Sequence, residues 1–451
     1  MSFPRYPKYK PSGVEWLGEV PEHWDVWKLA HAFALIASGT TPKTDNREYY
    51  DDGDIPWVNT GDLNDGELED CGKRITARAL ADHSSLKLYP AGSLLIAMYG
   101  ATIGKLAMLR FPATVNQACC VFAGASPIVS KFMFYWFLGL RQQILSLATG
   151  GGQPNVSQDI LRTLRVGCPD QAEQTKIASF LDRETSKIDG LVGEQRRLIE
   201  LLKEKRQAVI SHAVTRGLNP KAPLKPSGIE WLGDVPAHWS VQKMKWVAKM
   251  ESGHTPDKKI PDYWDGNIPW VSLNDTGFLK DHDYISETAY NITQLGIENS
   301  SAHLLPSRAV VFSRDATIGR CAITTRPMAV SQHFIAWICG ASIIPEFLLM
   351  RLRSMTRELD RLTTGATLKT IGMPEVRTIA TPVPPLDEQK AIIAWVSKET
   401  ANTDTLTAEA QRAIDLLQER RTALISAAVT GQIDVRGLAA SPAEDPAPYG
   451  A

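Results

Sequence analysis

Two stretches of this chain, 215 residues apart, have nearly the same sequence. Residues 10–29 read KPSGVEWLGEVPEHWDVWKL and residues 225–244 read KPSGIEWLGDVPAHWSVQKM, with fourteen of twenty positions identical. A period near 215 residues is far longer than the repeat of a solenoid, so it indicates a duplicated pair of domains. Two such copies predict a molecule with pseudo-two-fold symmetry that presents two similar faces.

The same offset persists along the rest of the chain. Short motifs of the first copy return in the same order in the second, within two residues of the 215-residue offset. They are Ser-Gly-x-Thr-Pro (38–42 and 252–256), Ile-Pro-Trp-Val (55–58 and 268–271), Ala-Thr-Ile-Gly-Lys/Arg (101–105 and 316–320), Glu-Gln (173–174 and 388–389) and Ala-Val-Thr (213–215 and 428–430).

Composition limits the class of protein. A chain of 451 residues is expected to form two or three units. Its 43% hydrophobic and 22% charged residues are typical of a globular protein, and its longest apolar run is too short to span a bilayer. The N-terminus lacks the apolar core of a signal peptide, so we expect a cytoplasmic protein with no membrane partner. Six cysteines without a Cys-x-x-Cys pair predict reduced thiols and no metal site.

Each copy divides into a globular part and a helical part. The globular parts, residues 10–165 (head one) and 225–378 (head two), alternate short apolar β-type runs with Gly, Pro, Asn and Asp turns. The runs 93–98 and 309–313 are predicted strands. Helices are expected over 131–147 and 346–362, each ending near a glycine at 150 or 365. We therefore expect a mixed α/β fold for each head.

The second part of each copy has heptad spacing. A helix of roughly 60 Å is predicted over 174–214, with a matching helix near the end of the chain. Each needs a partner along one apolar seam, and the simplest partner is the other helix, which makes an antiparallel coiled coil that separates the two heads. The predicted seam residues are Ile177, Leu181, Ile188, Leu191, Leu198, Leu202 and Val209, and Ile392, Val396, Leu406, Ala410, Ala413, Leu417 and Leu424.

This organisation resembles that of the specificity subunits of type I restriction-modification systems. The motifs that carry the resemblance are Trp-Leu-Gly-x-Val-Pro-x-His-Trp (16–24 and 231–239), the Ala-Thr-Ile-Gly turns, and the Pro-Asp-Gln-Ala-Glu-Gln and Pro-Leu-Asp-Glu-Gln segments that open the helices. The resemblance implies a target-recognition domain over 1–165, a helical region over 166–218, a second recognition domain over 219–378, a second helical region over 379–435, and a tail over 436–451. Its composition predicts that this tail is disordered.

The resemblance also implies the function and the partners. Each recognition domain is expected to read one half of a bipartite, asymmetric site in double-stranded DNA, while the helices set the spacer. Two modification subunits with S-adenosylmethionine and restriction (motor-nuclease) subunits with ATP and Mg²⁺ are the expected partners. The chain itself is expected to be a non-catalytic subunit without a cofactor.

Motifs for catalysis are absent from the sequence. The only Pro-Pro pair, at 383–386, lacks the flanks of a methyltransferase base-binding segment, and Gly100–Lys105 has the wrong spacing for a phosphate loop. The acidic residues near 170 and 387 have two interpretations. They fit the start of a helix, with Asp170 and Glu173 at capping-box spacing, and they also resemble a nuclease carboxylate pair with a lysine.

Polar loops of the heads supply the candidate DNA contacts, because base edges are read by a few amides and basic groups. A lysine or arginine after a glycine turn suits a phosphate contact or simply ends a hairpin, and a glutamine at one repeat position suits a base contact or a turn cap. The tryptophan pairs 16/24 and 231/239 suit packing better than base stacking. The candidates are Thr41, Lys43, Thr60, Lys105, Gln117, Gln153 and Asn155 in head one, and Lys258, Asn274, Arg314, Arg320, Gln332, His333 and Lys369 in head two.

Charged residues on the helices are candidates for subunit docking. Arg196, Arg197, Arg420 and Arg421 are predicted interface residues, although such runs are usually solvated helix faces. Two other functions fit the same organisation. An orphan specificity subunit would block DNA without a partner, and a structural coiled-coil protein would show no salt-dependent DNA binding.

The duplication predicts the behaviour of a fragment. Residues 1–218 retain one head and one helix, whose uncovered seam costs about 1.5–3 kcal/mol for each fully exposed apolar side chain. We expect the fragment to form an isologous dimer and, with its modification subunit, to direct methylation of an interrupted palindrome. Sedimentation and methylation mapping test both parts; a stable monomer or an unchanged asymmetric target would contradict the prediction.

Overall fold

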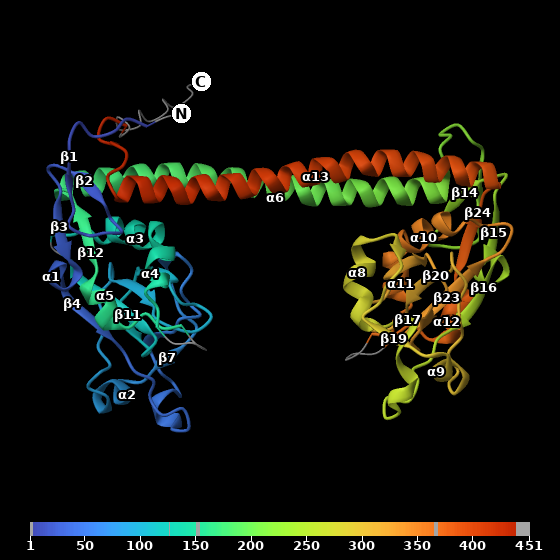
Figure 1. Cartoon of the computed structure of the whole chain (residues 1–451), viewed down its shortest axis with the longest axis horizontal. Helices are drawn as coiled ribbons and strands as arrows, with labels where there is room; N and C mark the ends of the chain where they lie inside the picture. The colour runs from blue at the N-terminus through green and yellow to red at the C-terminus, as the bar shows by residue number, and fades with distance from the viewer. Residues whose placement is uncertain (1–2, 126, 150–153, 365–368, 439–451) are drawn as a thin grey trace, which may run out of the picture. The chain divides into compact units, whose positions relative to one another are not determined.

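The computed structural model describes residues 3–125, 127–149, 154–364 and 369–438 (Figure 1). The chain forms two compact units, one of residues 1–195 and 412–451 and the other of residues 196–411. The first unit contains head one, the beginning of one long helix and the end of the other. The second contains head two and the remaining parts of both helices. Within the described residues, no helix is both long and apolar enough to cross a membrane.

Head one is built on a five-stranded and a three-stranded sheet. The larger sheet has the order β4-β11-β8-β9-β6 and the smaller one the order β10-β5-β7. Neighbours are antiparallel except for the pairs β6/β9 and β10/β5, which are parallel. The strands are β4 (Phe33–Ser38), β5 (Ile55–Val58), β6 (Gly66–Leu68), β7 (Arg74–Ile75), β8 (Leu94–Ala97), β9 (Leu106–Leu109), β10 (Thr114–Val115) and β11 (Cys119–Ala125).

Head two repeats both sheets strand for strand. Its orders are β16-β23-β20-β21-β18 and β19-β17-β22, with the equivalent pairs β18/β21 and β17/β22 parallel. The mixed α/β fold and the internal duplication are therefore confirmed. The strands are β16 (Ala248–Ser252), β17 (Trp264–Val271), β18 (Tyr284–Ile285), β19 (Tyr290–Ile292), β20 (Val310–Ser313), β21 (Cys321–Thr324), β22 (Ala329–Val330) and β23 (Phe334–Cys339).

Shorter elements complete each copy. Head one has the pairs β1/β2 (Tyr9–Pro11, Glu19–Pro21) and β3/β12 (Asp25–Lys28, Arg165–Cys168), and head two has β13/β14 (Leu224–Pro226, Asp234–Pro236) and β15/β24 (Ser240–Lys243, Ala380–Val383). The short helices are α1 (Leu29–Ala32), α2 (Ala77–Asp82) and α5 (Gln158–Thr163) in head one, and α7 (Met244–Val247), α8 (Thr276–Asp281), α9 (Gln294–Glu298) and α12 (Met373–Thr378) in head two.

The helix expected over 131–147 is two helices. α3 (Ser130–Gly139) ends at Leu140, whose φ of −112° and ψ of 17° leave the helical region, and α4 (Arg141–Ser146) follows. Head two breaks at the equivalent place between α10 (Pro345–Arg353) and α11 (Thr356–Arg361). The prediction of one continuous helix was wrong because apolar periodicity continues through the break. The glycines at 150 and 365 lie outside the described residues.

The two long helices are the longest elements of the chain. α6 spans Gln171–Arg216 and α13 spans Leu386–Val429. The Asp170 carboxylate accepts a hydrogen bond from the Glu173 amide at 2.8 Å, which caps the first turn of α6. In the second unit the Lys390 ammonium lies 3.2 Å from the Asp387 carboxylate. The acidic residues near 170 and 387 therefore begin helices, as the first of the two interpretations predicted.

A glutamate in the first turn of each helix binds the His-Trp segment of its own copy. Both carboxylate oxygens of Glu173 are engaged: they accept hydrogen bonds from Tyr6 Oη at 2.7 Å and Trp24 Nε1 at 3.1 Å, and His23 Nε2 lies at 2.8 Å. Glu388 accepts from Trp239 Nε1 at 3.0 Å and has His238 Nε2 at 2.8 Å.

The following glutamine ties the helix start to the loop after the last strand of the sheet. The Gln174 amide accepts from the Val129 N–H at 2.7 Å and donates to the Pro127 carbonyl at 3.1 Å. Gln389 bonds the Ile344 N–H and the Ser342 carbonyl in the same way. Both glutamines are fully buried, so the repeated Glu-Gln pair fixes each helix start to its head.

Within each unit the two helices run antiparallel. In the first unit, Asp189 of α6 pairs with Arg421 of α13 at 2.9 Å. In the second, Arg206 of α6 pairs with Asp404 of α13 at 3.2 Å. Asp189 and Asp404, like Arg206 and Arg421, are 215 residues apart, so the duplication places the same ion pair in both units.

The seam differs in part from the predicted one. Leu191, Leu198 and Leu406 are exposed by 47%, 42% and 49%, so they do not belong to it. These leucines made the apolar pattern look shifted by one position, because the true heptad line passes through polar residues. In α6 it follows Leu181, Thr185, Ile188, Val192, Ile199 and Leu202, and in α13 Val396, Thr400, Thr403, Ala410 and Ile414.

The end of the chain returns to its beginning within the first unit. The Asp434 N–H donates to the Pro4 carbonyl at 2.7 Å, and Tyr9 Oη donates to the Gly431 carbonyl at 3.1 Å. The first residues of the expected tail bond to the protein: Arg436 pairs with Asp434 at 2.7 Å, and the Leu438 carbonyl accepts from Arg183. Residues 439–451 lie outside the described part of the chain.

Replacing Glu173 tests how strongly a helix start is tied to its head. The side chain of Glu173 is 6% exposed, and Glu173→Ala leaves the Trp24 N–H and the Tyr6 hydroxyl without their acceptor. We expect a loss of about 3 kcal/mol in the free energy of unfolding, measured in urea by tryptophan fluorescence.

The matched control is Glu388→Ala. Glu388 is 26% exposed and binds a tryptophan and a histidine, so we expect a smaller loss because water replaces part of its contacts. Equal losses in the two variants, or none in Glu173→Ala, would contradict a buried anchor.

Candidate nucleic-acid interface

A threonine and a glutamine from two loops meet in each head. β4 pairs with β11, which places the loop after β4 beside the loop before β11. Thr41 Oγ1 donates to Gln117 Oε1 in head one, and Thr255 Oγ1 donates to Gln332 Oε1 in head two. Both glutamines are exposed. Gln117 and Gln332 thus occupy equivalent places in the two heads, and so do Thr41 and Thr255.

The end of the central strand of the smaller sheet lies next to this pair. In head one, Asn116 Nδ2 donates to Asn59 Oδ1 at 3.3 Å, and Thr60 follows as a half-buried residue. In head two, the equivalent strand β17 is followed by Ser272, whose amide donates to Asp275 at 2.8 Å, and Asn274 is exposed. The exposed Lys43 and Lys258 follow Thr41 and Thr255 in the neighbouring loop.

The basic residues Lys105 and Arg320 follow hairpin turns. Gly104 and Gly319 have φ of 77° and 85°, and a Cβ at either position would meet a leucine at 3.2 Å. Glycine is therefore required where β8 turns into β9 and β20 into β21. Lys105 is exposed and Arg320 is half-buried. The hairpin is present, and a phosphate contact from either residue stays a prediction.

Arg314 is bonded into the protein. Its guanidinium donates to the Gln332 carbonyl at 3.2 Å and to the Ile371 carbonyl at 3.2 Å. These bonds hold two loops together, and a DNA contact from Arg314 stays a prediction. The exposed Lys369 lies two residues before Ile371 and retains a free approach to solvent.

Asp315 orients His333, which the sequence did not reveal. Its carboxylate lies 2.8 Å from His333 Nδ1 and accepts a hydrogen bond from Thr370 Oγ1. His333 Nε2 then faces Gln332 Nε2 at 3.3 Å. Asp315 is 6% exposed, so the imidazole is held from behind by a buried carboxylate. Head one has Gly100 at this repeat position.

Asn155, a further candidate of head one, lies between α4 and α5. The Asn155 N–H donates to the Thr149 carbonyl at 2.9 Å, in the same arrangement as Thr370 and Thr364 in head two. Asn155 is exposed, and it is distant in sequence from Thr41 and Gln117. Gln153 lies outside the described residues.

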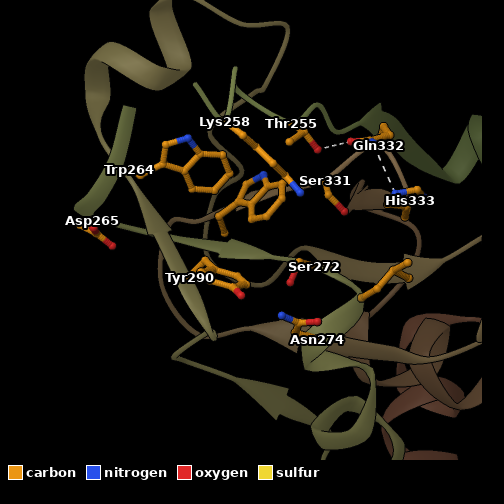
Figure 2. Close-up of a pocket in the computed structure, with 12 residues that line it drawn as sticks. Thr255, Lys258, Trp264, Asp265, Ser272, Asn274, Tyr290, Ser331, Gln332 and His333 are labelled. Atoms are coloured by element: carbon orange, nitrogen blue, oxygen red, sulfur yellow. Dashed lines mark hydrogen bonds between the residues drawn. The ribbon is translucent and has the colours of Figure 1, made fainter. Parts of the chain in front are cut away.

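A cavity of about 520 Å³ gathers four of the candidates in head two (Figure 2). Lys258, Asn274, Gln332 and His333 line it together with aromatic residues that the sequence analysis did not select. Trp264 and Trp270 lie in one strand, β17, whereas Tyr290 comes from β19. The aromatic lining consists of Trp264, Trp270 and Tyr290.

The tryptophans of the duplicated N-terminal segments pack against protein. Trp24 and Trp239 are fully buried, which confirms the packing interpretation for both. Trp16 meets Trp136 edge to face, with ring centroids 5.8 Å apart. Its repeat counterpart Trp231 has the guanidinium of Arg351 over its ring at 4.7 Å.

The cysteines are buried thiols without a nucleophilic environment. Five of the six are buried and Cys339 is half-buried, and none forms a disulfide. Burial raises the pKa of each thiol, to about 12 for Cys119 and Cys168. In the described part of the chain, no three His, Cys, Asp or Glu side chains are grouped to hold a metal ion.

On the helices, the predicted docking residues separate into two groups. Arg196, Arg197 and Arg420 are exposed. Arg421 is 27% exposed and pairs with Asp189 in a bidentate contact between the helices, and its role in subunit docking stays a prediction.

Comparison with known proteins gives the family. The model of the type I restriction modification DNA specificity domain matches twice, over residues 21–200 and 236–415. The chain therefore belongs to this family and carries two copies of its domain. It is a DNA specificity subunit of a type I restriction-modification system.

Relatives of similar length share a low identity along nearly the whole chain. The chain is 23% identical to the type I restriction enzyme MjaIX specificity subunit of Methanocaldococcus jannaschii, over 94% of this chain and 96% of that protein. It is 21% identical to the EcoKI specificity subunit of Escherichia coli strain K12, over 94% and 92% of the two chains.

Solved structures agree in fold. A chain from a study of the assembly and conformational transition of the type I system has a TM-score of 0.69 and 15% identity, covering 91% of this chain and 98% of that one. The HsdS subunit from Thermoanaerobacter tengcongensis has a TM-score of 0.50 and 15% identity, covering 92% and 98%.

The two glutamines provide a test of where sequence is read. Because a side-chain amide can discriminate between bases, we expect Gln117→Ala and Gln332→Ala each to relax selectivity at one base pair, by about 1–3 kcal/mol, in different halves of the target. The measurement is competition binding of the assembled complex with single-substitution duplexes.

Lys43→Ala is the control for the glutamine variants. A phosphate contact predicts uniform weakening on all duplexes and a shallower salt dependence, with no change in base preference. Glutamine variants that weaken all duplexes uniformly would assign Gln117 and Gln332 to turn capping.

Proposed function

We propose that each head reads one half of a bipartite, asymmetric DNA site. The observation that carries the proposal is the equivalent Thr–Gln pair on equivalent sheets, surrounded by different residues in the two heads. Equivalent placement supports two readers of one kind, and different neighbours support two different half-sites. Further contacts are proposed for Lys43, Thr60, Lys105 and Asn155 in head one and for Lys258, Asn274, Arg320, His333 and Lys369 in head two.

The long helices are proposed to set the spacer and to dock the modification subunits. The antiparallel segment in each unit and the Glu-Gln anchors support a rigid connection from each head to its helix start. The exposed Arg196, Arg197 and Arg420 are the proposed contacts. The duplication supports two modification subunits, one for each copy.

The chemistry is proposed to belong to the partners. S-adenosylmethionine would be held by the modification subunits, and ATP with Mg²⁺ by the restriction subunits. In this chain, the acidic residues that resemble a nuclease pair are occupied by structural bonds, since Glu173 and Glu388 bind tryptophan and histidine side chains. This supports a non-catalytic subunit, for which we propose a cytoplasmic location.

Two other functions remain to be distinguished. An orphan subunit would occupy DNA without modification subunits, and a structural coiled-coil protein would leave DNA unbound. Co-purification with a modification subunit separates the first from the proposal. Binding to duplex DNA that falls steeply with added salt separates the second.

The methylated motif is the test of the proposed function. In cells expressing this chain with its modification subunit, methylome sequencing should give two short, different specified parts with an unspecified spacer. Heads on one face of a duplex favour a separation near one helical turn, about 34–36 Å. A single continuous palindrome would contradict it.

A further inference from the structure

The cavity of head two has an aromatic end and a polar end. Figure 2 shows Trp264 and Tyr290 at one end and Gln332 and His333 at the other, with Lys258 on one side and Asn274 opposite. Trp264 stands edge-on to Trp270, with centroids 5.2 Å apart, and to Tyr290 at 6.5 Å. A flat ligand that enters this cavity meets aromatic surface first and hydrogen-bonding groups at its far edge.

The aromatic walls are held in place by the backbone. The indole N–H of Trp270 donates to the His254 carbonyl at 3.0 Å, and that of Trp264 donates to the Asp257 carbonyl at 3.2 Å. The polar groups of both rings are therefore satisfied within the protein. Trp270 is buried and Trp264 half-buried, while Tyr290 is 48% exposed at the rim.

The residue opposite the strand tryptophan differs between the two heads. In the antiparallel pairs β5/β7 and β17/β19, Lys73 lies opposite Trp57 where Tyr290 lies opposite Trp270. The Lys73 ammonium sits over the Trp57 ring, 5.7 Å from its centroid. Lys73 thus covers Trp57 in head one, whereas Tyr290 extends the aromatic surface of the cavity in head two.

A hollow of this kind does not suit a base that stays in the helix. Base edges in the major groove are read by side chains that project into it. In head two, Asn274, Gln332 and His333 line a cavity that also has aromatic walls. Proteins that take a base out of the stack hold it between aromatic side chains and bond its edge.

We propose that this cavity receives one nucleobase of the target DNA, unstacked from the duplex. The base stacks on the ring of Tyr290, with Trp264, which stands edge-on to that ring, beside it, and presents its edge to Asn274, Gln332 and His333, while Lys258 at the rim contacts the adjoining phosphate. Stacking on aromatic side chains strengthens binding by roughly 5- to 150-fold per base, which offsets the cost of unpairing. This inference rests on the proposed function and names the ligand of one of its two reading heads.

A mismatch scan tests the proposal. The full chain, in complex with its modification subunits, is titrated with duplexes carrying the mapped site, each with one specified pair replaced by a mismatch that keeps one native base. Because the unpairing cost is already met, a mismatch at the extruded base should tighten binding about tenfold. Direct reading of a stacked pair predicts weaker or unchanged binding.

Tyr290→Ala identifies which mismatch tightens binding through this cavity. The variant should abolish the gain in affinity at one mismatch position, and Tyr290→Leu, which keeps an apolar side chain in the strand, should do the same. Tyr284→Ala is the matched control, since Tyr284 is also on a strand, is 46% exposed and lies outside the cavity. Methyltransferases extrude the base that they methylate, so mismatches at the methylated bases should tighten binding in every variant.

The outcomes distinguish a failure of the base-binding proposal from a failure of the proposed function. A gain at one further position that both Tyr290 variants lose and Tyr284→Ala retains supports the proposal. If only the methylated bases show a gain, or if the further gain persists without Tyr290, the cavity does not hold a base. A wild-type complex that cannot distinguish its mapped site from a scrambled duplex would instead refute the proposed function.

Discussion

Each head depends on a hydrogen-bonded carboxylate and a buried amide at the start of its long helix. Glu173 and Gln174 bond the N-terminal segment, the loop after β11 and the helix itself. Removing these groups from water is tolerable only because each finds partners. The helix therefore cannot tilt relative to its head without breaking several bonds at once. A reading surface mounted in this way moves with its helix start as one body.

The duplication retained this anchor while other buried contacts changed. In the first copy Trp16 packs on Trp136, and in the second Trp231 packs on Arg351, which is fully buried. Burial lowers the pKa of the Arg351 guanidinium, because the low dielectric disfavours its charge. The face of the tryptophan ring partly offsets that cost through a cation–π contact. The scaffold thus admits one buried exchange of an aromatic ring for a cation without losing its sheet order.

The features predicted correctly from the sequence are those that leave an internal repeat or a periodic apolar pattern. The mixed fold, the two strands tested and both long helices followed from the 215-residue offset and from heptad spacing. The seam was partly wrong, since Leu191 and Leu198 are exposed while Thr185, Thr400 and Thr403 are buried. Hydrophobicity alone cannot place a heptad line that runs through threonines.

The candidate site was predicted less completely than the fold. Thr41 meets Gln117, and Thr255 meets Gln332, because the loops that carry them adjoin paired strands, which repeat position could suggest. Asp315 and the aromatic wall of head two arise from contacts between segments distant in the chain. Such contacts leave no periodic pattern and no fixed motif spacing in the sequence. Arg314 shows the converse, because a basic residue in a loop turned out to donate to two backbone carbonyls.

The paired ions of the helices show what duplication imposes on the seam. Each long helix carries one acid and one base of the interhelical pairs: Asp189 and Arg206 on α6, Asp404 and Arg421 on α13. An antiparallel partner with the same spacing satisfies both at once, whether that partner is the other helix or a second copy of the same one. A parallel arrangement would separate the acid of one helix from the base of the other. Partly buried Arg421 would then lose its carboxylate, at a cost beyond that of a surface pair. The charge pattern therefore selects the antiparallel orientation that threonines in the seam specify only weakly.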